Sequence, residues 1–174
     1  MKFDEIFNKI RYSQNSLSNH SMYFKKMINY NVQQDSDSDS YSDSEIEIQT
    51  PKTIIKQIIK ENGKEYLLLR FIRNTVSKEF YDQLLLLEEY HKKSTKADSI
   101  KSLILEDTLT VKVPIRYSKP YIKIIKEPGA EPFNYYHLAT GMKVICKLGG
   151  NSIWIDHNNN ANYNLIVKEI SIIT

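Results

Sequence analysis

The sequence predicts a mainly β (α+β) domain, a small barrel or sandwich with one helix after the first hairpin. Three features predict this fold: an Asn-Gly turn between two runs of branched residues, one stretch with helical periodicity, and a series of short alternating runs toward the C-terminus. The 174 residues leave room for one compact core. Because the chain has a single cysteine, no intramolecular disulfide can form and the core is expected to be held by burial alone.

The first hairpin is predicted at residues 53–72. Runs 53–60 and 65–72 are rich in branched residues and flank the tetrapeptide Glu-Asn-Gly-Lys. Asn-Gly tolerates the positive φ angles of a tight type I′ turn. The two strands are therefore expected to meet at Asn62 and Gly63.

Residues 76–93 have the periodicity of a helix. Ser77 is expected to cap its first turn. The predicted apolar stripe consists of Phe80, Leu84 and Leu87, with Tyr90 or Leu85 as its fourth member. His91 is expected to be solvated beside Lys92 and Lys93, where positive charge opposes the helix dipole.

The rest of the chain is predicted to be a succession of strands. In residues 109–117 an apolar face alternates with a cationic one, which places Tyr117 in the core and Lys112 outside, while Pro114 indicates an edge or a bulge. Further strands are expected at residues 121–126, 142–148, 153–156 and 164–173. Gly149-Gly150 is expected to end the second of these, and residues 157–162 are expected to form a polar turn.

Net charge divides the chain into three parts. Residues 1–30, a basic N-terminal arm, carry +3, residues 31–50 carry −6, and residues 51–174, the predicted β-rich domain, carry +6. The middle segment is rich in Ser and Asp and too polar to offset an ordering cost of about 1–2 kcal/mol per residue, so it is predicted to be a disordered acidic linker. It is either a solvated linker or a strap that folds back over a basic face and competes with nucleic acid, and its serines suit acid-directed kinases.

The N-terminal arm carries an apolar pattern of its own. Phe3, Ile6, Phe7 and Ile10 have the spacing of a short amphipathic helix. This helix would dock either on a protein partner or on the core.

Catalysis is not expected. The four histidines, His20, His91, His137 and His157, show no ligand spacing, and no P-loop, G-x-S-x-G or H-E-x-x-H motif occurs, so neither a metal nor a cofactor is predicted. His137 is expected to be structural. Glu88 and Glu89 are expected to form helical ion pairs with Lys92 and Lys93, and Cys146 to be buried and inert. No apolar stretch approaches the roughly 18 residues of a membrane span, so a soluble intracellular protein is expected.

Basic and aromatic residues on the later strands point to nucleic acid. Single-stranded nucleic acid needs cations for its phosphates and flat rings for its bases. The candidate binding residues are Lys112, Arg116, Tyr121, Lys123, Lys143, Lys147, Trp154 and Lys168. Lysines on an outward sheet face also protect strand edges, and Tyr and Trp are ordinary core residues, so the same pattern suits a purely structural role.

One stretch carries a resemblance to a known family. Tyr136-His137-Leu138, the run from Gly141 to Leu148, Ile153-Trp154-Ile155 and the run from Asn164 to Ile170 resemble the end of single-stranded-DNA-binding-like proteins of nucleocytoplasmic large DNA viruses. The bias toward Ile, Lys, Asn and Tyr is similar to that of mimivirus-type viruses. The resemblance covers roughly residues 105–173, and it departs from the family in its longer polar turn and in Tyr163-Asn164 before the closing strand.

The resemblance implies an OB-like barrel that binds single-stranded DNA, or RNA, without strong sequence preference and without turnover. Trp154 and Tyr121 would then stack on bases, although a core position suits Trp154 equally well. The lysines and Arg116 would neutralise phosphates. Its location would be the host cytoplasm, in a viral factory, or the virion. The alternative is a virion or scaffold module whose basic body meets an acidic protein and whose N-terminal arm docks on a partner.

Overall fold

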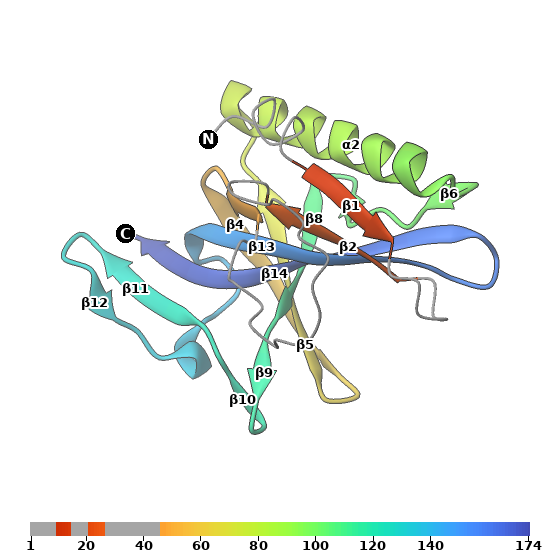
Figure 1. The fold of residues 1–174 in the computed structure, drawn as a ribbon. Coiled ribbons are helices and arrows are strands. Elements are labelled where there is room, and N and C mark those ends of the chain that lie inside the picture. Colours follow the sequence, from red (N-terminus) through yellow and green to blue (C-terminus); the bar gives the residue numbers. More distant parts are fainter. Residues whose placement is uncertain (1–9, 15–20, 27–45) are drawn as a thin grey trace.

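The computed structural model describes residues 10–14, 21–26 and 46–174 (Figure 1). Its centre is a closed barrel of strands β4 (Thr53–Glu61), β5 (Lys64–Phe71), β8 (Thr108–Val113), β14 (Asn160–Ile173) and β13 (Lys143–Ile155), which are hydrogen-bonded in this order. Pairing of β13 with both β14 and β4 closes the ring. Within the described residues, the predicted mainly β fold with one helix is confirmed.

The barrel has the strand order of an OB-like fold. In chain order its first, second and third strands are neighbours, and the third, β8, runs parallel to the fifth, β14. In OB-folds the face of the second and third strands and the turns after the first and fourth strands bind oligonucleotides. These positions correspond here to β5, β8, the β4–β5 turn and the β13–β14 turn.

The β4–β5 hairpin confirms the predicted turn. Asn62 and Gly63 have φ angles of 51° and 72°, and Glu61 pairs with Lys64 across the turn. Both central residues are left-handed, as a type I′ turn requires. A bulge between Ile55 and Gln57 shifts the register of β4 further along.

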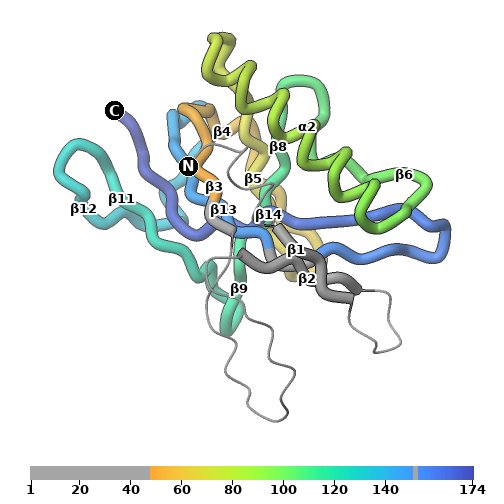
Figure 2. The backbone as a smooth tube through the Cα atoms, turned by 45° about the horizontal axis from the view of Figure 1, so that its top comes forward, coloured from red at the N-terminus to blue at the C-terminus, as the bar shows by residue number. Residues whose placement is uncertain are grey.

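Helix α2 (Thr75–Thr95) lies along one side of the barrel (Figures 1 and 2). Its N-cap is Asn74, whose side chain accepts from the Ser77 backbone N–H, so the prediction that Ser77 caps the helix is wrong. Ser77 itself is buried. The apolar stripe includes Phe80, Leu84 and Leu87 as predicted, while Leu85 is 41% exposed.

His91 is the fourth inward member of the helix stripe. It is fully buried, so the prediction that it is solvated is wrong. It lies four residues after Leu87 and therefore shares the same face of the helix. Burial lowers the pKa of His91 to about 3, which keeps the imidazole neutral.

The barrel interior is filled by the alternating residues of its strands. The core includes Ile55, Leu67, Leu69, Leu109, Val111, Val113, Val144, Cys146, Leu148, Leu165 and Val167, all completely buried. Cys146 is in the core as predicted, and burial raises the pKa of its thiol to about 12. Alternation places the intervening residues, such as Tyr66 and Lys112, on the outer face of the barrel.

Short strands extend the sheet around the barrel. On β13 these are β2 (Ser21–Lys26) and β3 (Ile46–Gln49), with β1 (Ile10–Gln14) pairing with β2. On β14 they are β11 (Lys123–Glu127) and β6 (Ser99–Ile100). β12 (Glu131–Pro132) pairs with the other side of β11, and β7 (Ile104–Leu105) pairs with β8. β9 (Ile115–Arg116) and β10 (Lys119–Pro120) form a separate hairpin, and η1 (Tyr135–His137) is a single 3₁₀ turn.

Three sequence predictions differ from these elements. β13 continues through Gly149-Gly150, because residues on both sides of the pair bond to β14. Pro114 ends β8, so the alternating phase is lost there and Tyr117, expected in the core, is 98% exposed. Residues 46–49, part of the predicted linker, form β3, in which Ile48 is buried.

Two predictions about the N-terminal part of the chain concern mostly residues that the structure does not describe. Ile10, the last position of the predicted helix, begins β1, and the other positions of that helix lie outside the described residues. Residues 31–45 of the acidic linker also lie outside them.

Candidate nucleic-acid interface

A groove of about 530 Å³ lies on the outer face of the barrel. Its floor is formed by β5 and β8, and its sides by the end of β4, the segment before β7, and the β13–β14 hairpin. The lining side chains used below are Ile59, Glu61, Lys64, Tyr66, Leu68, Lys101, Leu103, Thr110, Lys112 and Trp154. This is the face at which OB-folds bind oligonucleotides.

Strand register sets the floor of the groove. Tyr66 pairs with Ile59 of β4 on one side and with Lys112 of β8 on the other. Directly paired residues on one face are about 4.5–5.5 Å apart at Cβ, so the Tyr66 ring and the Lys112 stem are neighbours. Next to them Leu68 pairs with Thr110. The floor is therefore an aromatic and aliphatic surface that includes one cationic side chain, Lys112.

Trp154 supplies a second aromatic side chain at the other side of the groove. It is half-buried and pairs with Asn162 on β14. Its neighbour Ile153 is completely buried, which shows that alternation turns Trp154 to the outer face. The indole of Trp154 and the phenol of Tyr66 thus line the same hollow.

The groove is cationic. Lys64, Lys101 and Lys112 line it, and Glu61 is the carboxylate among the lining residues. Lys64 and Lys101 are exposed, so their ammonium groups are available to a ligand in the groove. Positive charge beside aromatic rings is the combination that single-stranded nucleic acids require.

Helix α2 holds the segment that forms one wall. Glu88, which is buried, accepts hydrogen bonds from the Ser102 hydroxyl (2.9 Å) and the Leu103 backbone N–H (3.0 Å). The backbone of the segment is also tied to the barrel, since Lys101 N–H donates to Ala161 (2.8 Å) and Thr110 N–H donates to Leu103 (2.8 Å). Glu88 therefore serves a structural purpose and not the predicted helical ion pair, whereas Glu89 does pair with Lys93 (2.8 Å).

The β13–β14 turn beside the groove is held by one carboxylate. Asp156 accepts from the backbone N–H groups of Asn158 (2.9 Å) and Asn160 (3.0 Å) and from the side-chain amide of Asn162 (3.4 Å). These hydrogen bonds, led by that from the Asn160 backbone, lower the pKa of Asp156. The turn is thus ordered by its own side chains, with His157 and Asn158 exposed.

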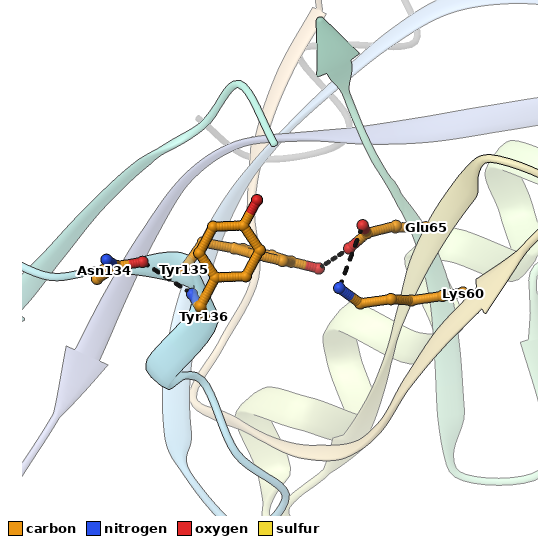
Figure 3. A network of polar contacts seen from close by, with 5 residues as sticks. All are labelled: Lys60, Glu65, Asn134, Tyr135 and Tyr136. Atoms are coloured by element: carbon orange, nitrogen blue, oxygen red, sulfur yellow. Dashed lines mark hydrogen bonds and ion pairs between the residues drawn. The ribbon is translucent and has the colours of Figure 1, made fainter. Parts of the chain in front are cut away.

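A second polar network supports the β4–β5 turn (Figure 3). The Tyr135 hydroxyl donates to the Glu65 carboxylate (2.6 Å), and Lys60 forms an ion pair with the same carboxylate (3.3 Å). Lys60 also lies over the rings of Tyr135 (5.8 Å) and Tyr136 (5.5 Å). Burial and the adjacent Glu65 carboxylate raise the pKa of Tyr135, so it stays a hydrogen-bond donor.

The structure separates the eight residues predicted to bind nucleic acid. Lys112 and Trp154 line the groove. Lys123 and Lys147 lie beside Glu169, at 2.9 Å and 3.1 Å from its carboxylate oxygens, on the outer side of β11, β14 and β13. Lys143 is at the start of β13, opposite Ile54, and Lys168 is exposed on β14. Arg116 and Tyr121 are on and beside the β9–β10 hairpin.

Sequence reasoning missed Tyr66, Lys64 and Lys101 as groove residues. A signal for two of them was present, because Lys64 and Tyr66 are out of phase with the core residues Leu67 and Leu69 and therefore face outward. Their approach to Lys112 depends on the β5–β8 register, which no local pattern contains. Lys101 is in an irregular segment whose position is set by Glu88.

Neither a group of metal-ligating side chains nor a membrane-spanning helix is found in the described part of the chain. Within residues 10–14, 21–26 and 46–174, no group of three or more His, Cys, Asp or Glu side chains is arranged to hold a metal ion. Among the helices of the same ranges, none has the length and apolar character needed to cross a membrane.

No family model matches the chain, and no curated protein matches it in sequence. Among solved structures it is similar to gp2.5, a single-stranded DNA binding protein encoded by bacteriophage T7, with a TM-score of 0.51 and 8% identity over 74% of this chain and 86% of that one. It is also similar to a C-terminally truncated single-stranded DNA-binding protein from bacteriophage Enc34, with a TM-score of 0.47 and 10% identity over 97% and 96% of the two chains.

Proposed function

We propose that this chain binds single-stranded DNA, or RNA, in the groove on β5 and β8, without sequence preference and without turnover. One observation carries the proposal: Tyr66 and Trp154 line the groove together with Lys64, Lys101 and Lys112, on the barrel face where OB-folds bind oligonucleotides. The phage protein gp2.5, which shares the fold, is named as a single-stranded DNA binding protein. The predicted origin in a large DNA virus stays a prediction.

The floor of the groove suits bases of any sequence. It is formed by a ring, a leucine, Thr110 and the stem of a lysine, and stacking on such a surface accepts any base because every base has a flat face. Each stacked base contributes about 1–3 kcal/mol. The three lysines contact phosphates, which are the same in every sequence.

Trp154, the only tryptophan in the chain, allows a direct test. Adding oligo-dT at low salt is expected to quench its fluorescence, whereas a duplex of the same length is expected to have a much weaker effect, because paired bases cannot stack on the indole. A Tyr66→Ala variant is expected to bind about 5- to 150-fold more weakly, the range that corresponds to the loss of one stacked base. No binding of any oligonucleotide at low salt would overturn the proposal and favour the protein-interaction alternative.

Salt dependence tests the role of the lysines. Affinity falls as salt rises, and removing one phosphate contact makes the plot of log affinity against log salt less steep by about 0.7 for a single strand. Lys112→Gln is expected to show this decrease. Lys126→Gln, which removes an exposed lysine of β11 away from the groove, is the matched control and is expected to keep the slope of the unmodified protein.

A further inference from the structure

The β9–β10 hairpin presents an aromatic residue at its tip. Arg116 pairs with Lys119, and the two residues between them, Tyr117 and Ser118, have φ angles of 50° and 61°. A bulky residue rarely adopts positive φ, and such residues gather at functional sites. Tyr117 is 98% exposed at this turn and so contributes almost nothing to the core.

A second ring on the hairpin is already arranged with a cation. Tyr121 is 61% exposed, its N–H donates to the Pro114 carbonyl (2.8 Å), and the Arg116 guanidinium carbon lies 4.2 Å from its ring centroid. This contact fixes the face of the ring and places a charge beside it. Residues 114–126 contain no Asp or Glu, so the hairpin is purely cationic.

The hairpin is continuous with the groove. A hollow of about 340 Å³ lies between the β4–β5 turn and the hairpin, and its lining includes Lys60, Lys64, Ile115 and Ser118. Lys64 and Glu61 line both this hollow and the groove. Figure 1 shows the two hairpin tips extending from the same end of the barrel. A chain that leaves the groove past Lys64 therefore reaches the hairpin directly.

Of the two carboxylates that line this hollow, one is already paired with protein groups. Glu65 is bound to Lys60 and to the Tyr135 hydroxyl, which leaves Glu61 as the one exposed acid among the residues that line the hollow (Figure 3). Beyond it come Arg116 and Lys119. The charge along the path therefore suits a polyanion.

We infer that the β9–β10 hairpin is a second stacking station for the same single strand, where Tyr117 and Tyr121 hold bases and Arg116 and Lys119 contact phosphates. This inference rests on the proposed function of the groove. The strand then runs from Trp154 and Tyr66 across the Asn62-Gly63 turn to the hairpin. It follows that a short oligonucleotide fills the groove alone and a longer one occupies both stations.

A length series of oligo-dT tests this on the full chain. The variant Tyr117→Ala/Tyr121→Ala is expected to bind an oligonucleotide of about 20 nucleotides at least tenfold more weakly, and one of about five nucleotides as tightly as the unmodified protein. Tyr117→Phe/Tyr121→Phe, which keeps both rings, is expected to retain affinity for both lengths. Both rings are exposed, and an unchanged thermal unfolding midpoint checks that the fold is kept.

The outcomes separate this inference from the proposed function. If the unmodified protein binds both lengths and the alanine variant binds each length as tightly as the unmodified protein does, the hairpin station is overturned while the groove stands. Equal losses at both lengths also overturn a separate station. If the unmodified protein binds the long oligonucleotide but not the short one, and Tyr66→Ala has no effect, the groove is overturned. No binding at either length overturns both.

Discussion

The hydroxyl of Tyr163 on β14 donates a 2.6 Å hydrogen bond to the carboxylate of Glu88 on helix α2. Both residues are buried, and the same carboxylate oxygen accepts from the segment that forms one wall of the groove. Burial and the adjacent carboxylate hold the pKa of Tyr163 well above its usual value, so the hydroxyl stays a donor. The helix, the barrel and the groove wall are thus joined at one side chain.

Removing this carboxylate is expected to destabilise the fold. Glu88→Ala leaves the Tyr163 hydroxyl and the Leu103 N–H without their acceptor, which is expected to lower the free energy of unfolding by about 2–4 kcal/mol in denaturant titrations. Tyr163→Phe should cost less, because it removes a single donor. The double variant should cost less than the sum of the two, since the pair interacts directly. Glu89→Ala, next along the helix but exposed, is the control and should change stability little; equal losses at Glu88 and Glu89 would contradict this role.

Stability is expected to depend on pH through His91. Its pKa is held near 3 by burial and is about 6.5 in the unfolded chain. Below pH 6.5 the unfolded chain binds a proton that the folded protein does not, so folding stability falls by roughly 1.4 kcal/mol per pH unit until about pH 3. Above pH 6.5 His91 has no such effect.

The variant His91→Leu isolates this contribution. It cannot titrate, so its free energy of unfolding should fall less steeply than that of the unmodified protein between pH 6.5 and pH 4, measured by urea titration at each pH. Parallel profiles would show that the imidazole is protonated in the folded state.

The lysines around Glu169 are expected to matter little for binding. Lys123 and Lys147 share the carboxylate, and their hydrogen bonds, that from Lys123 first, lower the pKa of Glu169. Their positive charge is partly neutralised and lies away from the groove. Lys123→Ala should therefore leave oligonucleotide affinity within about twofold, whereas Lys112→Ala should weaken it several-fold. A larger loss at Lys123 would move the binding surface to β11.

The β4–β5 turn is expected to require Gly63. A Cβ on Gly63 would meet nothing within 4 Å, so the cost of Gly63→Ala arises from its φ of 72° alone and should be about 1 kcal/mol of unfolding free energy. Asn62→Gly, at a neighbouring position with φ of 51°, should be close to neutral. Equal costs for the two changes would show that the turn adopts another conformation.

Local patterns in the sequence predicted much of the fold. The Asn62-Gly63 turn and the alternation of Leu109, Val111 and Val113 depend on neighbouring residues and were predicted correctly. At Pro114 only an edge or a bulge was expected, whereas the strand breaks there because β8 ends at Val113. Tyr117 was misplaced because its phase was counted across that same break. His91 was misplaced because it was grouped with the basic residues Lys92 and Lys93, although its spacing from Leu87 puts it on the buried face of the helix.

The proposed binding surface was harder to predict because it depends on strand register. Lys112 and Trp154 were chosen for their chemistry and do line the groove, yet their partner Tyr66 lies 46 and 88 residues earlier in the sequence. In the sequence, Lys123 and Lys147 were as good candidates for phosphate contacts as Lys112. What separates them is Glu169, which only the pairing of β11 and β13 with β14 brings between them.

Ultraviolet cross-linking of oligo-dT to the full chain, followed by peptide mapping, tests the central claim most directly. We expect adducts at Tyr66 and Trp154 in the groove, and these should disappear when unlabelled single strands compete. Adducts confined to peptides of β11 or of the outer side of helix α2, with none at Tyr66 or Trp154, would contradict it.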